Sequence, residues 1–192
     1  MRKAVQKRSL ETRSRLICAA EEIVLQHGHE PLRVEEVVLR AGVAKGTFFV
    51  HFKDKDELLD LLIGAQMHLI LDRMVSRVPP QTVDELVTRL IPMVQLLGSE
   101  RCVFDVVLRR SGSAALSDIG PIASALGRLQ STVSEWLKVG QYRQDTPAEL
   151  LAEGVEAFML QVPALNFCAL SPRKSMKARL QAYLRAWLVV PT

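Results

Sequence analysis

The fold of this chain is decided by one stretch, residues 44–52, which reads A-K-G-T-F-F-V-H-F. It follows a segment that ends in Ala41-Gly42-Val43 and precedes the run K-D-K-D-E-L-L. A small-residue turn, a compact helix with a cationic start and an aromatic body, and then a capped amphipathic helix are typical of a helix-turn-helix. We therefore expect residues 45–51 to form the second helix of such a motif.

Two more helices are expected before this stretch. Residues 10–27 carry apolar side chains at helical spacing, and Gly28 is expected to end that helix. Residues 34–41 form the next predicted helix, and Gly42 supplies the sharp turn after it. Residues 1–9 are expected to form a flexible basic arm that includes Arg2 and Lys3.

The rest of the chain also predicts helices, because no segment alternates as a strand does. Capping boxes mark helix starts at Asp54, Thr82 and Thr146, and further helices are expected over residues 100–110, from Pro121 and from Ser171. Residues 111–120 are expected to form a loop, and Pro163 to interrupt the helix that begins at Thr146. The prediction is an all-α chain of about nine helices, with a DNA-binding domain over residues 1–53 and a second helical domain over residues 54–192.

Composition excludes some classes of protein. The 192 residues are 48% apolar but only 5% aromatic, so the core is expected to be aliphatic. No apolar run approaches the roughly 18 residues that cross a bilayer. Three widely spaced cysteines (Cys18, Cys102 and Cys168) predict buried thiols rather than a disulfide framework, which favours a cytoplasmic location without membrane attachment.

The net charge of +4 is unevenly distributed along the chain. Residues 1–55 carry 11 Lys/Arg and 7 Asp/Glu, which gives 11 − 7 = +4. Residues 56–170 carry 9 and 14, which gives −5, and residues 171–192 carry 5 and 0, which gives +5. The basic N-terminal block suits a polyanionic partner because it contains the helix-turn-helix pattern.

Residues 12–62 resemble the TetR family of bacterial transcriptional regulators. The resemblance is carried by the order A-G-V, K-G-T, an aromatic pair, H-F and then K-x-E-L-L within residues 34–59. It implies a homodimer in which residues 45–51 of each subunit enter the major groove of a palindromic double-stranded DNA operator. It also implies a C-terminal domain for dimerisation and for binding a small-molecule effector, and repression as the default activity.

The helix expected over residues 45–51 and the helix starts beside it supply the expected DNA contacts. Lys45 and Thr47 lie in its first turn, where side chains meet base edges, and Gly46 lets the backbone approach closely. Lys55 begins a helix whose terminal amides suit a phosphate. The predicted DNA-binding residues are Arg33, Val34, Lys45, Gly46, Thr47, Phe49, His51 and Lys55.

Four residues depart from the family pattern. Phe49 stands where Tyr is usual, and Ala44 and Arg33 stand where capping Ser or Thr residues are usual. Val38 replaces a small Ala. A lost cap costs about 0.5–2 kcal/mol, so we expect retained DNA binding with an atypical operator, with Arg33 contacting a phosphate.

The second domain is expected to hold an apolar effector, because the sequence shows no pattern for a charged ligand. Apolar residues at helical spacing are usually ordinary core, so the alternative for each candidate residue is a purely structural role in packing. The candidate effector-binding residues are Gln66, Met67, Ile70, Met93, Leu97, Phe104, Leu108, Trp136, Phe158, Gln161 and Asn166.

The last two helices are expected to form the dimer interface, as the resemblance implies. Ala152, Gly154 and Ala157 permit close approach. Glu149, Glu153 and Glu156 make the first of these helices acidic, and Arg173, Lys174, Lys177, Arg179 and Arg185 make the second basic, so that complementary faces would set the register.

Other functions have less support. No nucleophile–base pair or phosphate loop indicates an enzyme, and His27-Gly28-His29-Glu30 falls in a turn that is expected to be exposed, so neither a metal ion nor a cofactor is predicted. A redox sensor is disfavoured because the cysteines lie in apolar helical contexts. The remaining alternative is a helical protein-interaction module whose DNA affinity is attenuated by the four departures.

Overall fold

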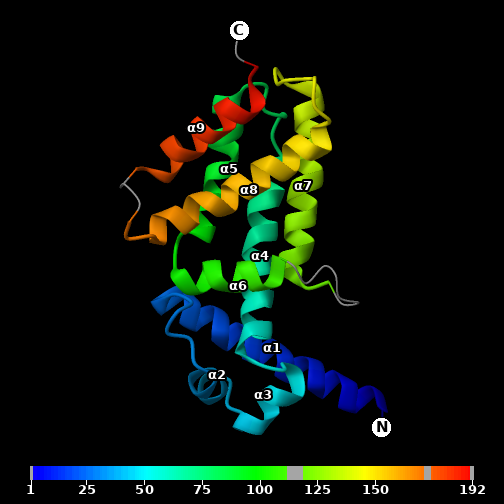
Figure 1. Cartoon of the computed structure of the whole chain (residues 1–192). Coiled ribbons are helices and arrows are strands. Elements are labelled where there is room, and N and C mark those ends of the chain that lie inside the picture. Colours follow the sequence, from blue (N-terminus) through cyan, green and yellow to red (C-terminus); the bar gives the residue numbers. More distant parts are fainter. Residues whose placement is uncertain (1, 112–118, 171–173, 191–192) are drawn as a thin grey trace.

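The computed structural model describes residues 2–111, 119–170 and 174–190, and these residues form nine helices and no strand (Figure 1). This confirms the predicted all-α class. The helices are α1 (Arg2–His27), α2 (Val34–Arg40), α3 (Lys45–His51), α4 (Lys55–Val75), α5 (Val83–Leu97), α6 (Arg101–Ser111), α7 (Pro121–Val139), α8 (Ala148–Phe167) and α9 (Met176–Leu188).

The first three helices pack together at one end of the molecule, and α4 leads from them into the other helices (Figure 1). Their shared core contains the fully buried side chains of Leu16, Ile23, Phe48 and Phe52. Burying large apolar side chains of this kind contributes roughly 1.5–3 kcal/mol each. The apolar interior of this small unit is continuous with the core of the helices that follow.

Two glycines make the turns of this unit. Gly28 has φ +84° after α1, and Gly42 has φ +65° between α2 and α3. Both values lie in the left-handed region, where glycine has no Cβ to clash with the backbone. The two turns that the sequence placed at these glycines are therefore confirmed.

The remaining helices form a second, larger bundle. The long helices α4 and α7 pack against each other, α8 packs on α7 and α5, and α9 packs on α5 and α8 (Figure 1). Helix α6 lies across the junction between this bundle and α1 (Figure 1). Side chains of Asp54, Thr82 and Ser175 accept the hydrogen bonds that cap α4, α5 and α9.

The expectation of a flexible arm at residues 1–9 is wrong from Arg2 onward, because α1 begins at Arg2. Residues 2–9 contain neither Gly nor Pro. Lys, Arg, Gln and Ala are good helix formers, so nothing in this segment ends the helix. The side chains of Arg2 and Lys3 lie outside the described residues.

Two expectations about α8 are also wrong. The capping box at Thr146 does not form, because the Glu149 carboxylate accepts instead from Lys138 Nζ at 2.9 Å. Nor does Pro163 interrupt the helix, which continues to Phe167. Pro163 and Val162 are buried, and that packing offsets the backbone hydrogen bond that proline removes.

Helix α9 begins at Met176, and the predicted start at Ser171-Pro172 lies outside the described residues, as do Arg173 and residues 112–118 of the expected loop. The expectation of buried cysteines is wrong for Cys18 and Cys168, which are exposed. Cys18 lies off the buried stripe that Leu16, Ala20 and Ile23 form on α1. Cys102 is half-buried, and this burial raises the pKa of its thiol to about 11.

Candidate DNA-binding interface and effector domain

Helix α3 is anchored by aromatic side chains on one side and exposes the other side. Phe48 and Phe52 are buried with their ring centroids 5.3 Å apart, and the Arg13 guanidinium lies 4.7 Å from the Phe52 centroid. Phe48 and Phe52 therefore belong to the core. Lys45, Gly46 and Phe49 lie on the exposed surface, and Thr47 is half-exposed.

The ammonium group of Lys45 is paired within the chain. Its Nζ lies 2.5 Å from Glu35 Oε1, and Glu35 belongs to the first turn of α2. The hydrogen bond from Lys45 lowers the pKa of the Glu35 carboxyl below its usual value. Sequence reasoning overlooked Glu35, although the spacing of ten residues across the turn could have indicated the contact.

The guanidinium of Arg33 turns back onto its own chain. Its Nη1 donates to the carbonyl of Glu30 at 2.9 Å and to the carbonyl of Leu32 at 3.1 Å. Neither Arg33 before α2 nor Ala44 before α3 caps its helix with a side-chain hydrogen bond. Both helices therefore lack the stabilisation that a Ser or Thr cap provides.

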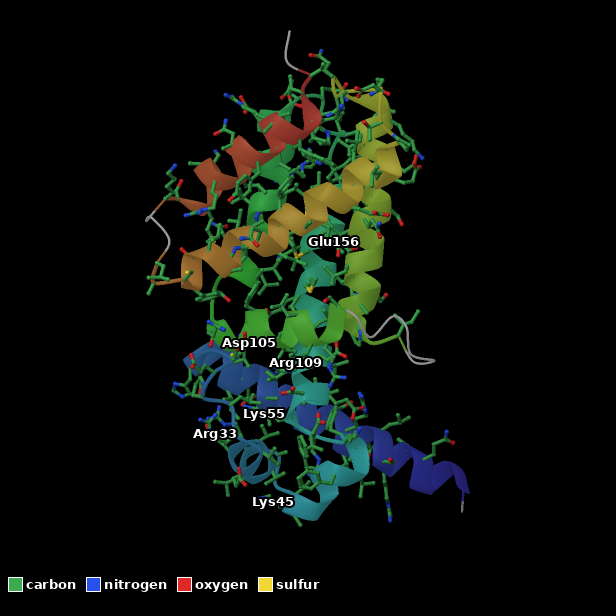
Figure 2. The ribbon with its side chains drawn as sticks, viewed as in Figure 1. Arg33, Lys45, Lys55, Asp105, Arg109 and Glu156 are labelled. Carbon is green, nitrogen blue, oxygen red and sulfur yellow. The ribbon has the colours of Figure 1, made fainter. Side chains whose placement is uncertain are left out.

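The remaining predicted contacts surround α3. Val34 and His51 are half-buried, at the start of α2 and the end of α3. Lys55 is the first residue of α4 and forms no salt bridge within the described parts of the chain. Figure 2 shows Lys45 at the end of the molecule that α2 and α3 form, and Lys55 nearer to α6. The predicted DNA-binding residues thus lie on α2, α3 or the residue before α2, except Lys55, which begins α4.

A carboxylate outside this unit holds the turn after α1. Glu100, which precedes α6, accepts from the backbone N–H of His29 at 2.9 Å, from His29 Nδ1 at 2.8 Å and from the backbone N–H of Glu30 at 2.8 Å. Although partial burial opposes ionisation, these hydrogen bonds lower the pKa of Glu100 overall. The contact joins residues about 70 positions apart, so no local pattern could have predicted it.

The other end of α6 is held to α4. Arg109 Nη2 lies 2.9 Å from Asp56 Oδ2, and Arg110 Nε lies 3.8 Å from Asp60 Oδ2 (Figure 2 shows Arg109 on α6). Asp60 is buried and also accepts from the backbone N–H of Ile122 at 3.0 Å, in the first turn of α7. Burial raises the pKa of Asp60 in spite of these partners. Helix α6 is therefore attached both to the turn before α2 and to α4.

Only some of the candidate effector-binding residues share the core of the second domain. Leu108, Gln161 and Asn166 are exposed, whereas Gln66, Ile70 and Phe158 are half-buried. An open surface groove lies elsewhere, between the start of α5 and the end of α9. The fully or almost fully buried candidates are Met67, Met93, Leu97, Phe104 and Trp136.

Within the chain, two of the charged side chains on α8 and α9 pair with other helices. Glu149 of α8 pairs with Lys138 of α7, and Arg185 of α9 pairs with Asp84 of α5 at 2.9 Å. Glu156 is half-buried on α8, and burial raises the pKa of its carboxyl (Figure 2). Close approach at Gly154 occurs within the chain, because a Cβ there would meet the Trp187 ring of α9 at 2.4 Å.

No helix in the described parts of the chain is both long enough and apolar enough to cross a membrane. A three-helix unit with an exposed, cation-bearing third helix, followed by a helical bundle, is the architecture of a helix-turn-helix unit joined to further helices. Residues 16–62 match the family model described as bacterial regulatory proteins of the tetR family. This match supports a TetR-family regulator, and the relatives that the chain resembles are described as transcriptional regulators.

Individual relatives agree with this assignment. The chain is 24% identical over 160 residues to the HTH-type transcriptional repressor BepR of Brucella suis, covering 78% of this chain and 76% of BepR. The solved structure of Thermus thermophilus FadR with lauroyl-CoA has a TM-score of 0.60 at 20% identity, covering 91% and 92% of the two chains. RolR with resorcinol has a TM-score of 0.66 at 18% identity, covering 95% and 90%.

Proposed function

We propose that this regulator is a homodimeric repressor that binds a palindromic operator through α3 and is released by an apolar small molecule. The observation that carries the DNA-binding part is the arrangement of α3, in which Phe48 and Phe52 anchor the helix and leave Lys45 and Thr47 outward. An anchored helix with an exposed cationic first turn can enter a major groove and reach base edges.

Within this proposal, residues 1–53 form the DNA-binding domain and residues 54–192 the effector-binding and dimerisation domain. Lys45, Gly46, Thr47 and Phe49 meet the groove, while Val34, His51 and Lys55 meet phosphates. Arg33 joins them only after its guanidinium leaves the two carbonyls that now accept from it. Exchanging one set of hydrogen bonds for another contributes little net affinity.

The proposed effector enters between α4 and α8. FadR and RolR, which share this fold, are described in complex with lauroyl-CoA and resorcinol. In this chain the buried candidates Met67 and Met93 are flexible, unbranched side chains that can repack around a ligand. The exposed candidates Leu108, Gln161 and Asn166 would contact it only if α6 or α8 moved.

The experiment that tests the function is an anisotropy titration of the full chain against DNA from beside its own gene and against a genomic fragment pool. We expect sequence-selective binding that weakens with salt, and Lys45→Ala should weaken it about tenfold, since a good base contact contributes about 1–3 kcal/mol. Lauroyl-CoA and resorcinol are then added to the complex, and release by either identifies the effector class.

The competing function is a helical protein-interaction module with attenuated DNA binding. Two observations favour it: the starts of α2 and α3 lack side-chain caps, and Lys45 is paired with Glu35 of the same chain. It predicts equal, weak binding to all fragments and no effect of Lys45→Ala. That outcome would refute the proposed repressor function.

A further inference from the structure

An acidic residue lies within the proposed DNA-reading surface. Glu35 is in the first turn of α2, and its carboxylate lies 2.5 Å from the ammonium group of Lys45 in the first turn of α3. Both side chains are exposed, at 57% for Lys45 and 65% for Glu35. The pair is therefore accessible to DNA.

This pair places the Lys45 ammonium where two partners compete for it. An exposed ion pair contributes only about 0–1 kcal/mol in water, so a phosphate or a guanine can displace Glu35. Once displaced, the carboxylate stays close to the DNA, where its negative charge repels the phosphates. Both effects weaken binding, and both act at the cation that is expected to read bases.

We propose that Glu35 attenuates DNA binding by holding Lys45 in the free protein and opposing its transfer to DNA. Glu35 is thus an affinity-determining residue of the reading surface, although it need not touch a base. The inference rests on the proposed function, because it assumes that Lys45 contacts DNA.

The neighbouring residue provides a matched control. Glu36 carries the same charge in the same helical turn, but it pairs with Arg40 of α2 at 3.0 Å rather than with Lys45. The substitutions Glu35→Gln and Glu36→Gln therefore change the net charge equally. Only the first frees Lys45.

The test measures the affinity of the wild type, Glu35→Gln, Glu36→Gln, Lys45→Ala and the double variant Glu35→Gln/Lys45→Ala. Each full-length protein is titrated by anisotropy over a salt series against a duplex that the wild type selects from the fragment pool and against random duplex. We expect Glu35→Gln to bind about three- to tenfold tighter at low salt, from release of an exposed pair and loss of repulsion. Glu36→Gln should stay within about twofold, because a surface charge away from the cation has a small effect.

The gain should shrink when Lys45 is absent, because only the repulsion between Glu35 and the phosphates then remains. Equal gains from Glu35→Gln and Glu36→Gln would mean that net charge alone acts, and a gain of the same size with Lys45→Ala would mean that the pair is irrelevant. Weaker binding by Glu35→Gln would mean that Glu35 orients Lys45 or accepts from a base. Each of these results overturns the inference.

Failure of the proposed function gives a different pattern. If the wild type binds selectively and Lys45→Ala weakens it, the function stands, and the response to Glu35→Gln alone decides the inference. If neither the wild type nor Glu35→Gln binds any duplex, the function fails and the inference fails with it. Circular dichroism melting verifies that each variant is folded.

Discussion

At the scale of single residues, adjacent aromatics in α3 have opposite environments. Phe48 is fully buried, whereas Phe49 is 52% exposed, although their rings touch with centroids 5.3 Å apart. Helical geometry turns neighbouring side chains by about 100°, so only one of the two can face the core. This alternation allows the short helix α3 to pack against the core with one side and to expose the side that we propose reads DNA.

This difference predicts unequal effects on stability. Phe48→Ala should lower the free energy of unfolding by about 3–5 kcal/mol, because it leaves a cavity in a small core. Phe49→Ala should cost about 1 kcal/mol or less, from the lost ring contact. Urea denaturation of the two variants measures both values, and similar losses would show that the packing of α3 is not as described.

At the scale of elements, α6 is attached at both ends by carboxylates. Glu100 holds the turn after α1, and Arg109 and Arg110 reach Asp56 and Asp60 of α4. Hydrogen bonds to a charged acceptor are stronger than neutral ones, at about 1.5–3 kcal/mol. A displacement of α6 would therefore be transmitted to the unit that carries α3 along two routes.

The Glu100 contacts predict a pH dependence of stability. The folded pKa of Glu100 lies below its ordinary value of 4.5, so its stabilisation is complete above pH 4.5 and is lost as the pH falls through the folded pKa. Glu100→Gln should cost about 2 kcal/mol at pH 7, and its difference from the wild type should shrink below pH 4.5.

Denaturation at pH 7 and in steps below pH 4.5 measures this difference. Asp105→Asn is the control, because Asp105 pairs with Arg101 at 2.9 Å on an exposed face of the same helix (Figure 2). A pH-independent cost for Glu100→Gln would show that shape rather than charge matters at the junction.

At the scale of the whole molecule, α8 and α9 pack against the bundle and leave side chains such as Ala157 and Ala186 exposed. Within the chain, these helices are joined by the Trp187 ring, whose Nε1 donates to the carbonyl of Leu151 at 3.0 Å. The proposed dimer would use the remaining outer face, where small side chains permit helices to approach closely.

This interface predicts that Ala157→Lys lowers the molecular mass in solution from dimer to monomer without unfolding the chain. A buried ammonium group without a partner is costly, whereas the same group in a monomer is solvated. Ser131→Lys, on the exposed side of α7, is the control and should stay dimeric. Light scattering after size exclusion measures the mass, and an unchanged Ala157→Lys dimer would place the interface elsewhere.

Local chemistry explains why much of the fold could be predicted from sequence. Gly28 and Gly42 end helices because their backbone conformations suit glycine, and Asp54 and Thr82 start helices because their side chains cap neighbouring amides. Such signals involve residues within a few positions of one another, so one sequence contains all the information that they need.

Only the tertiary structure decided the pairings between distant residues. It diverted Glu149 from a helix cap to Lys138, continued α8 through the buried Pro163, and brought Glu100 to His29. The first two outcomes are competitions between a local preference of about 1–3 kcal/mol and contacts whose partners the chain order does not reveal. The sequence by itself determined the class of protein and predicted its reading helix, whereas the folded molecule decided which charges have partners within the chain.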